Sequence, residues 1–268
     1  MSQYSFGAGI LYAKQLQDAS GNTIALPTPV KFGALQDVSL DISWDTKMLH
    51  GSNQFPLAVG RGKGKISGKA KFAQLNGAAL NSVIFGQTLT AGQRGVNNDT
   101  SAGTLIPATP FTLTGVTTAP SAIQFLIPSN GVFEKDLGVR NAVTGIPLTR
   151  VASAPIAGQY SVNETTGAYL FASADNVSGV RVQIDFSYTF TGSGGKSIVS
   201  NLPMGYAPSF SIDLSQNFGG KVATLSLFSC LGSKLTLATK LDDFFVPEFA
   251  FEAFADASGN VFQYSLSE

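Results

Sequence analysis

The sequence predicts an all-β protein made of two packed antiparallel sheets, as a sandwich or barrel, with one short α-helix and an inserted small β-domain. Three observations lead to this fold class. Side chains alternate with a period of two over long stretches, turn-forming residues separate these stretches, and helical spacing occurs in only one segment. The 268 residues provide enough chain to bury a substantial core.

The first strand expected from this alternation covers residues 37–45. Apolar and acidic side chains take turns along it, so one face is apolar and the other is acidic. The apolar residues are Val38, Leu40, Ile42 and Trp44, and the acidic residues are Asp37, Asp41 and Asp45. This pattern is typical of a strand with one buried face.

A second strand, over residues 61–72, carries a row of cations. These are Arg61, Lys63, Lys65, Lys69 and Lys71. The positions between them are mostly glycine or alanine, so the opposite face is nearly bare backbone. Such a strand buries little apolar area, and we expect it to lie against another backbone at close range or against a neighbouring chain. This pattern predicts a self-assembling structural protein rather than an enzyme.

Two short sequences occur twice. The pentapeptide at residues 18–22, Asp-Ala-Ser-Gly-Asn, returns at residues 256–260, and its residue types suit a hairpin turn. Residues 38–43 and 210–215 both place three apolar side chains on one face and Ser, Asp and Ser on the other. We expect two similar turns and two strands that share one sheet or occupy equivalent places in two sheets.

Residues 72–85 are the one segment with helical spacing. Their apolar side chains recur at intervals of three and four, and Gly86 is a suitable helix end. The expected packing face consists of Phe72, Leu75, Ala79, Leu80, Val83 and Ile84. We expect one short amphipathic helix that packs across a sheet.

The composition and the alternation pattern of the sequence change between residues 88 and 195. Loops rich in Gly, Asn, Thr and Pro bracket several short alternating runs, which is typical of a small all-β unit. We expect one discontinuous domain of residues 1–87 and 196–268 and an inserted β-rich region of residues 88–195. This region is either a separate small sandwich or an elaboration of a single larger one.

Composition favours association. The chain has 17 basic and 17 acidic residues, and charged residues make up only 13%, so its surface is weakly protected against self-association. The single cysteine, Cys230, lies in an apolar run and is expected to be a small buried residue in a reducing compartment. The sequence contains neither a signal peptide pattern nor an apolar run long enough to cross a membrane. We therefore expect synthesis in a cytoplasm.

Sequence motifs that suggest catalysis or cofactor binding have the wrong spacing or lie in the wrong secondary structure. His50 is the only histidine, which leaves too few ligands for a zinc site and no base for a triad. The Gly-Gly-Lys-Ser at residues 194–197 lacks the earlier glycine of a phosphate-binding loop. The glycines at residues 60–64 enter a strand rather than a helix, which excludes a dinucleotide fingerprint. We expect no enzymatic activity, no cofactor and no metal.

Two other functions remain as weaker alternatives. The acid pairs Asp242–Asp243 and Glu248–Glu252 lie among phenylalanines, which is more typical of a core strand with acidic ends than of a sugar site. The basic strand is capable of contacting phosphates, but the neutral chain lacks the interleaved aromatic residues of specific nucleic-acid binding.

Two blocks carry a resemblance to a known family. Residues 42–73 read Ile-Ser-Trp-Asp-Thr-Lys-Met-Leu-His-Gly-Ser-Asn-Gln-Phe-Pro-Leu-Ala-Val-Gly-Arg-Gly-Lys-Gly-Lys-Ile-Ser-Gly-Lys-Ala-Lys-Phe-Ala, and residues 240–256 read Lys-Leu-Asp-Asp-Phe-Phe-Val-Pro-Glu-Phe-Ala-Phe-Glu-Ala-Phe-Ala-Asp. Together with the helix, they resemble the tail tube proteins (major tail proteins) of long-tailed bacteriophages. The likeness is clearest over residues 33–87 and 202–268, and its motifs are compositional.

This resemblance implies a structural virion protein without catalytic residues. Six copies would close a ring, their inner strands would form a continuous barrel, and stacked rings would form the channel for genome delivery. The implied partners are other copies of the chain, tape measure, tail terminator and baseplate proteins, and a sheath if the tail contracts. DNA would pass through without specific binding, no membrane would be involved, and the protein would reside in the virion tail after synthesis in the host cytoplasm.

The charged strands suggest how copies meet. We hypothesise that the face with Arg61, Lys63, Lys65, Lys69 and Lys71 contacts acids of an adjoining subunit or ring, because complementary charge fixes register. The row formed by Asp37, Asp41 and Asp45 supplies such acids. Two alternatives remain open: another virion or surface assembly protein, such as a capsid decoration or fimbria-like subunit, and a carbohydrate-binding or hydrolytic β-sandwich.

Overall fold

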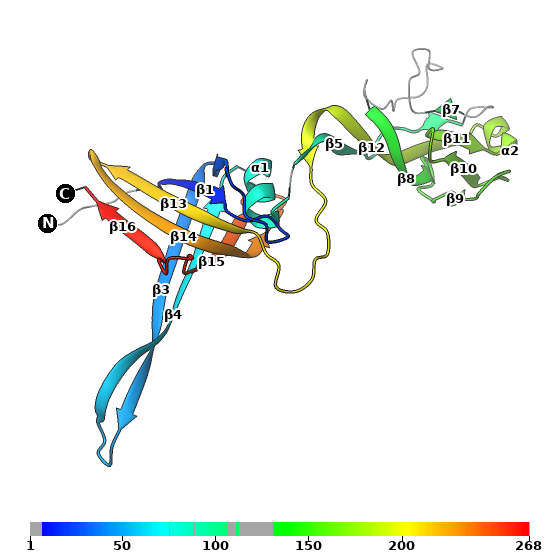
Figure 1. Ribbon diagram of the computed structural model, residues 1–268. Helices are drawn as coiled ribbons and strands as arrows, with labels where there is room; N and C mark the ends of the chain where they lie inside the picture. The colour runs from blue at the N-terminus through cyan, green and yellow to red at the C-terminus, as the bar shows by residue number, and fades with distance from the viewer. Residues whose placement is uncertain (1–6, 75, 88, 107–110, 113–130, 268) are drawn as a thin grey trace. The chain divides into compact units, whose positions relative to one another are not determined.

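The computed structural model describes residues 7–74, 76–87, 89–106, 111–112 and 131–267. Strands account for 56% of the residues and helices for 6%, which confirms the all-β prediction. The chain forms two compact units: unit 1 comprises residues 1–89 and 197–268, and unit 2 comprises residues 90–196. Figure 1 labels the elements of both.

Unit 1 is built on one antiparallel sheet of eight strands. The order across the sheet is β2 (Pro29–Lys31), β1 (Ile10–Gln15), β13 (Ser209–Phe218), β14 (Lys221–Thr236), β15 (Glu248–Phe254), β4 (Pro56–Phe72) and β3 (Leu35–His50), and β16 (Phe262–Leu266) pairs with β14 beside β15. The expected strands 37–45 and 61–72 thus lie within the β3–β4 hairpin. These eight strands share one hydrogen-bonded sheet, although the sequence suggests two stacked sheets.

The core of unit 1 lies on one face of this sheet and is rich in phenylalanine. Phe249 is fully buried, and its ring centroid lies 6.1 Å from that of Phe32, 5.8 Å from that of Phe210 and 5.7 Å from that of Phe251. The repeated alternating segments both contribute apolar side chains to this core, one from β3 and the other from β13. The two segments therefore share one sheet, but they are not paired strands, because β3 pairs with β4 and β13 pairs with β1 and β14.

The helical segment begins later than expected. Asn76 caps α1 (Gly77–Ala79) by accepting hydrogen bonds from the N–H groups of Ala78 and Ala79, and the chain continues as the π-helical turn η1 (Leu80–Phe85). Gly86 ends it in the left-handed conformation, with φ at 61°.

The packing face of this helical segment is partly as expected. Ala79 and Val83 are buried in the core of unit 1, Ile84 packs against it, and Leu80 is half-buried. The prediction is wrong for Phe72, which is the last residue of β4 and enters the core from the sheet. Leu75 lies outside the described residues.

The two copies of the repeated pentapeptide form the same turn. Asp18 Oδ1 accepts hydrogen bonds from the N–H groups of Ser20 and Asn22, and Asp256 Oδ1 accepts the equivalent pair from Ser258 and Asn260. In each turn the aspartate N–H also donates to the carbonyl of the asparagine. The expectation of two similar turns is confirmed. The expected hairpin at the second turn is wrong, because β15 and β16 both pair with β14 rather than with each other.

Unit 2 consists of two four-stranded sheets that enclose a second core. One sheet contains β5 (Thr90–Asn97), β6 (Thr104–Leu105), β8 (Gly131–Asn141) and β12 (Arg181–Lys196), and the other contains β7 (Phe111–Thr112), β9 (Thr149–Arg150), β10 (Gln159–Asn163) and β11 (Ala168–Phe171). Both sheets contribute to one cluster of buried residues, among them Phe133, Tyr169 and Phe186. Unit 2 also contains a short helix, α2 (Ser173–Val177), which the sequence did not predict.

The two ends of unit 2 are held together. Thr90, the first residue of β5, pairs with Lys196, the last residue of β12, and the Thr90 hydroxyl donates a hydrogen bond to the Lys196 carbonyl at 3.0 Å. The chain therefore enters and leaves this unit at adjacent positions.

Candidate assembly surface

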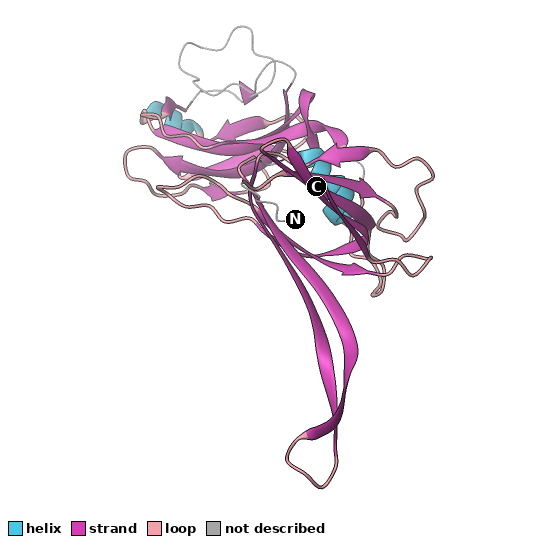
Figure 2. Ribbon diagram, turned by 90° about the vertical axis from the view of Figure 1, so that its left-hand side faces the viewer, coloured by secondary structure: helices cyan, strands magenta, loops and turns pink. Residues whose placement is uncertain are grey.

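The β3–β4 hairpin extends well beyond the rest of its sheet. Figures 1 and 2 show it as a long two-stranded ribbon that leaves the body of unit 1. β15 accompanies β4 only as far as the pair Ala253 and Ile66, and no residue between Ser43 and Lys65 is buried. We call residues 44–64 the arm. A hairpin without a packed face is marginally stable in water, so an arm of this length is expected to pack against another molecule.

A β-bulge lies at the base of the arm. Trp44 pairs with Gly64, but Thr46 pairs with Arg61, so two residues of β4 oppose Asp45 alone. The extra residue turns the Arg61 side chain to the face of Trp44, where its guanidinium carbon lies 4.3 Å from the centre of the indole ring. The prediction that Arg61 belongs to the lysine row is therefore wrong.

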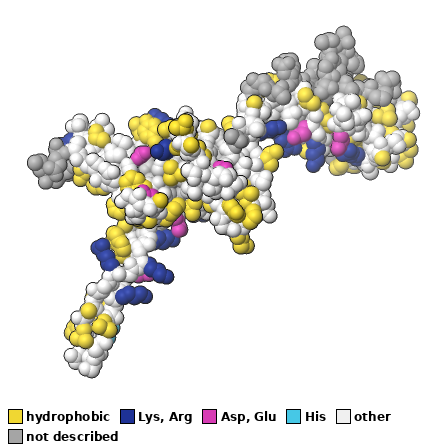
Figure 3. Space-filling view, viewed as in Figure 1, with side chains coloured by type: hydrophobic (Ala, Val, Ile, Leu, Met, Phe, Trp, Pro, Cys, Tyr) yellow, Lys and Arg dark blue, Asp and Glu magenta, His cyan; other side chains and the backbone are white. Residues whose placement is uncertain are grey.

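The end of the arm is apolar. Its side chains Met48, Leu49, Phe55, Leu57 and Val59 are all more than half exposed, with Phe55 at 80%. The sequence contains no Asp, Glu, Lys or Arg from residue 48 to residue 60. We call these five residues the arm tip, and Figure 3 shows hydrophobic side chains gathered near the end of the arm. These five residues are not among the site residues predicted from the sequence, although two apolar runs on either side of a Gly-Ser-Asn turn indicate such a hairpin end.

Acids of the same chain pair with part of the lysine row. Lys71 Nζ lies 3.9 Å from Asp37 Oδ2 and 3.9 Å from Glu248 Oε2, and Lys65 Nζ lies 3.1 Å from Glu252 Oε1. β4 thus runs between two strands that both carry acids. The hypothesis that these lysines meet acids of another subunit needs correction for Lys65 and Lys71. Glu248 and Glu252 thus each lie beside a lysine of β4.

Other charges on this face have no ion pair among the described residues. They are Lys63, Lys69, Asp41 and Asp45. Lys69 pairs across the strands with Ser39 and Ala250, which carry no charge. These four side chains remain available for contacts with another molecule.

Aromatic rings cover the bare face of β4 near the body. A Cβ atom on Gly68 would lie 2.3 Å from the Phe251 ring, and one on Gly64 would lie 3.0 Å from the Trp44 indole. Gly60, in the arm, has nothing within 4 Å of that position. The expectation that another backbone covers this face is therefore wrong at Gly68 and Gly64, where side chains of neighbouring strands fill the space.

One margin of the sheet is open. β3 is the last strand in the order, so within the described residues no strand pairs with its outer edge. Its sixteen residues expose a long row of backbone N–H and C=O groups. An edge of this length readily accepts a strand from another chain.

Among the described residues, no group of three His, Cys, Asp or Glu residues is placed to hold a metal ion. His50 is exposed at the end of β3, and Asp243 pairs with Lys240 at 3.5 Å. Cys230 is fully buried, and burial raises the pKa of its thiol to about 12. None of the described helices combines the length and apolar character of a membrane span.

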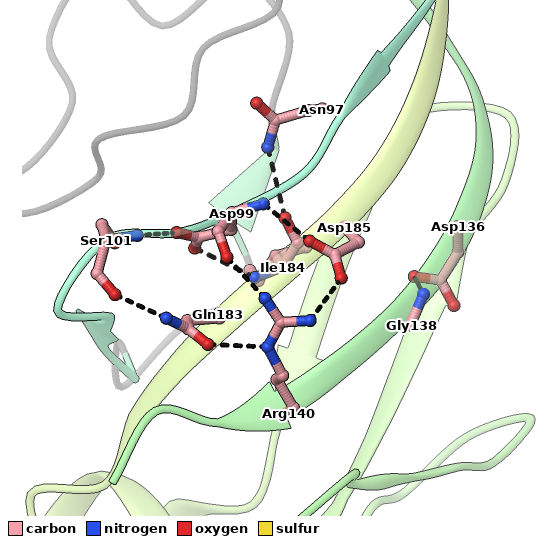
Figure 4. A network of polar contacts seen from close by, with 9 residues as sticks. All are labelled: Asn97, Asp99, Ser101, Asp136, Gly138, Arg140, Gln183, Ile184 and Asp185. Carbon is pink, nitrogen blue, oxygen red and sulfur yellow. Dashed lines mark hydrogen bonds and ion pairs between the residues drawn. The ribbon is translucent and has the colours of Figure 1, made fainter. Parts of the chain in front are cut away.

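Unit 2 satisfies its buried carboxylates internally. Asp136 accepts hydrogen bonds from the hydroxyls of Tyr160, at 2.7 Å, and Tyr169, at 2.8 Å. In a second network, Arg140 donates to Asp185 at 3.0 Å and to Gln183 at 2.7 Å, and Asp99 is held nearby (Figure 4). Each acid has protein donors, and the guanidinium group of Arg140 supplies the positive charge beside Asp185. Both networks therefore have a structural role.

Comparison of the sequence with protein-family models and with curated proteins finds no match.

Proposed function

We propose that this chain is a structural subunit of a tube assembled from identical copies, the tail tube protein of a long-tailed bacteriophage. The arm is the observation that carries this proposal. It exposes apolar side chains at the end of a ribbon that none of the described residues of unit 1 covers, and a second copy would bury them. The sequence resemblance supplies the identity of the assembly: rings of six copies stacked around a channel for the genome.

Two further features support self-assembly. Closure of a ring would pair the free edge of β3 and remove the risk of uncontrolled strand addition. The low charge of the chain is expected when much of its surface is covered by copies of itself. Tape measure, terminator and baseplate proteins are proposed as further partners on the resemblance alone, as is the location in a virion tail.

Electron microscopy of the purified chain tests the proposal. Negative staining across a range of protein concentrations should reveal hollow tubes or six-fold rings. A protein that stays monomeric at every concentration, or that binds glycans as a monomer, would contradict the proposal. Trimers, caps or solid fibres would instead favour another virion or surface assembly protein.

Lys69, one of the two lysines of this face without an ion pair among the described residues, provides a second test. Lys69→Glu is expected to leave unit 1 folded, since the side chain is exposed and has no ion pair among the described residues. Tube formation should be lost if Lys69 meets an acid of another copy. Lys14→Glu, on β1, is the matched control for a charge change at an exposed lysine of the same sheet. Normal tubes from Lys69→Glu would overturn this role.

A further inference from the structure

The acidic side chains of unit 2 are buried or paired within the unit. Three of them are at most 8% exposed and accept hydrogen bonds from backbone N–H groups or tyrosine hydroxyls: Asp99, Asp136 and Asp175. Three others form ion pairs with arginines: Asp185, Glu134 and Glu164. The sequence of residues 90–196 contains no other acid. Unit 2 therefore leaves no acid without a partner.

Half of the basic side chains of unit 2 have no acid beside them. The unit has six basic residues, and three of them, Arg94, Arg140 and Arg150, form the ion pairs with acids. The other three are exposed and form no ion pair among the described residues: Lys135, Arg181 and Lys196. The sequence of unit 2 is neutral, but its unpaired charges are all positive. Such a surface favours an anionic partner.

Alternation along β12 defines an outer face of its sheet. The core contains Val182, Ile184 and Phe186, so Arg181 and Ser187 belong to the opposite side of the strand. We call this side of the sheet the outer face. Figure 3 shows basic and acidic side chains gathered along one side of unit 2.

The two unpaired lysines lie on the outer face with Arg181. Lys135 is the cross-strand neighbour of Ser187. Glu134 accepts a hydrogen bond from the Ser187 hydroxyl at 2.9 Å, so its carboxylate lies on the same face. A hydrogen bond from Arg94 and the positive charge of Lys196 both lower the pKa of Glu134, which indicates that Lys196 lies near this carboxylate. The outer face thus collects the unpaired cations of unit 2.

The outer face is long enough for a polymer. Arg181 and Thr189 are eight residues apart on β12, which is about 26 Å at ~3.3 Å per residue. Thr189 pairs across the strands with Arg94 on one side and with Val132, which is 53% exposed, on the other. A single small anion would contact one cation at a time, whereas a chain with repeated anionic groups would meet cations at both ends of the face.

A nucleic acid fits this face less well than an acidic chain without bases. Single strands bind through exposed aromatic side chains that stack on bases, and no aromatic side chain of unit 2 is exposed among those that the structure describes. A duplex bound by charge alone requires many phosphate contacts, and the face has three unpaired cations. The face already binds carboxylates, since Arg94 and Arg140 each hold one of the unit's own acids.

We propose that the outer face of unit 2 binds a linear acidic polysaccharide. Lys135, Arg181 and Lys196 pair with carboxylates repeated along the sugar chain, and Thr189 and Val132 contact the sugar units between them. Each exposed ion pair is weak by itself, and several along one chain act together. Every residue that carries this inference lies in unit 2, so it goes beyond the proposed function and does not depend on it.

Binding of the full-length chain to polygalacturonate tests the proposal. Biolayer interferometry at low ionic strength should show binding that added salt weakens, and no binding to neutral dextran. Absence of binding to polygalacturonate, or equal binding to dextran, would overturn the proposal. Tighter binding to duplex DNA or to polyglutamate than to polygalacturonate would show that the partner is not a polysaccharide.

Removal of charge from the outer face should weaken binding selectively. Replacement of its three unpaired cations should lower the affinity by about tenfold or more. The substitutions are Lys135→Gln, Arg181→Gln and Lys196→Gln. The matched control replaces three exposed lysines of unit 1 that have no ion pair among the described residues: Lys14→Gln, Lys221→Gln and Lys234→Gln. The control should leave the affinity unchanged, and an equal loss in both variants would contradict the assignment of the face.

A charge-conserving variant separates loss of charge from loss of fold. Lys135→Arg, Arg181→Lys and Lys196→Arg keep every positive charge and should keep the affinity within about threefold. Hydrogen exchange should show unchanged protection of unit 2 in the glutamine variant, because all three side chains are exposed. A charge-conserving variant that loses binding as the glutamine variant does would refute recognition by charge.

Electron microscopy of the same samples keeps the two proposals distinguishable. Polysaccharide binding by a chain that forms no tube or ring would support this inference and contradict the tube function. Tubes that do not bind polygalacturonate would support the tube function and overturn this inference.

Discussion

Units 1 and 2 differ in how completely each satisfies its own groups. In unit 2, two tyrosine hydroxyls donate hydrogen bonds to the buried Asp136, Arg140 pairs with Asp185, and two sheets enclose a shared core. Unit 1 has an equally well packed core, but it also exposes an arm and a strand edge that is unpaired among the described residues. The difference supports the proposal that unit 1 is completed by association with other copies.

The sharpest test of this contrast removes the arm. Replacing residues 46–61 with a two-residue turn should abolish assembly, because the arm tip is lost. The fold of unit 1 should persist, since none of these residues belongs to its buried core. Circular dichroism should show an unchanged melting transition while electron microscopy shows no tubes. Tubes from the shortened chain would contradict the role of the arm.

The second-largest effect is expected from a substitution in the core of unit 1. Phe249→Ala removes a fully buried ring that packs on three other phenylalanines, so unit 1 should lose about 3–5 kcal/mol of unfolding free energy. Urea unfolding followed by hydrogen exchange would measure each unit separately. The amides of unit 2 should keep their protection, and a parallel loss there would show that the units do not unfold independently.

A glycine pair on β4 compares the body of unit 1 with the arm. Gly68→Ala should destabilise unit 1 by ~1–3 kcal/mol, because the new methyl group would lie 2.3 Å from the Phe251 ring. Gly60→Ala meets nothing within 4 Å and should change the unfolding free energy by less than ~0.5 kcal/mol. Denaturant titration of both variants measures the two changes in unfolding free energy. Equal changes would contradict the difference expected between the body of unit 1 and the arm.

High pH should weaken unit 2 through its buried tyrosines. Burial, together with Asp136, raises the pKa values of Tyr160 and Tyr169 above the ordinary value for tyrosine. Above pH ~10 the unfolded chain releases these protons and the folded chain keeps them, so stability falls with rising pH by up to ~1.4 kcal/mol per pH unit for each tyrosine. Hydrogen exchange of unit 2 should show this fall. Tyr169→Phe should make it shallower, and an unchanged slope would exclude this cause.

A small effect is expected at the surface ion pair of unit 1. Lys65→Gln breaks its contact with Glu252, but both side chains are more than half exposed. The unfolding free energy should change by less than ~1 kcal/mol, and added salt should reduce the difference further. A larger loss in denaturant titration would mean that this charged face supports the fold of the single copy.

Local patterns in the sequence predicted much of the fold but only part of the candidate surface. Alternation identified the β3–β4 hairpin, and the Asp-Ala-Ser-Gly-Asn turns form as their side-chain chemistry requires. The position of Arg61 was not predictable in this way, because the bulge depends on how two strands pair. The roles of Glu248 and Glu252 depend on β15 lying beside β4, a contact between residues far apart in the sequence. Helix α2 was missed because five residues are too few to show a helical period.

Because its first and last residues pair with each other, unit 2 is replaceable by another domain. Thr90 and Lys196 lie side by side, so any domain whose termini are close together would bridge the same gap in unit 1. Exchange of this segment by genetic grafting would replace unit 2 and leave the strands of unit 1 unchanged.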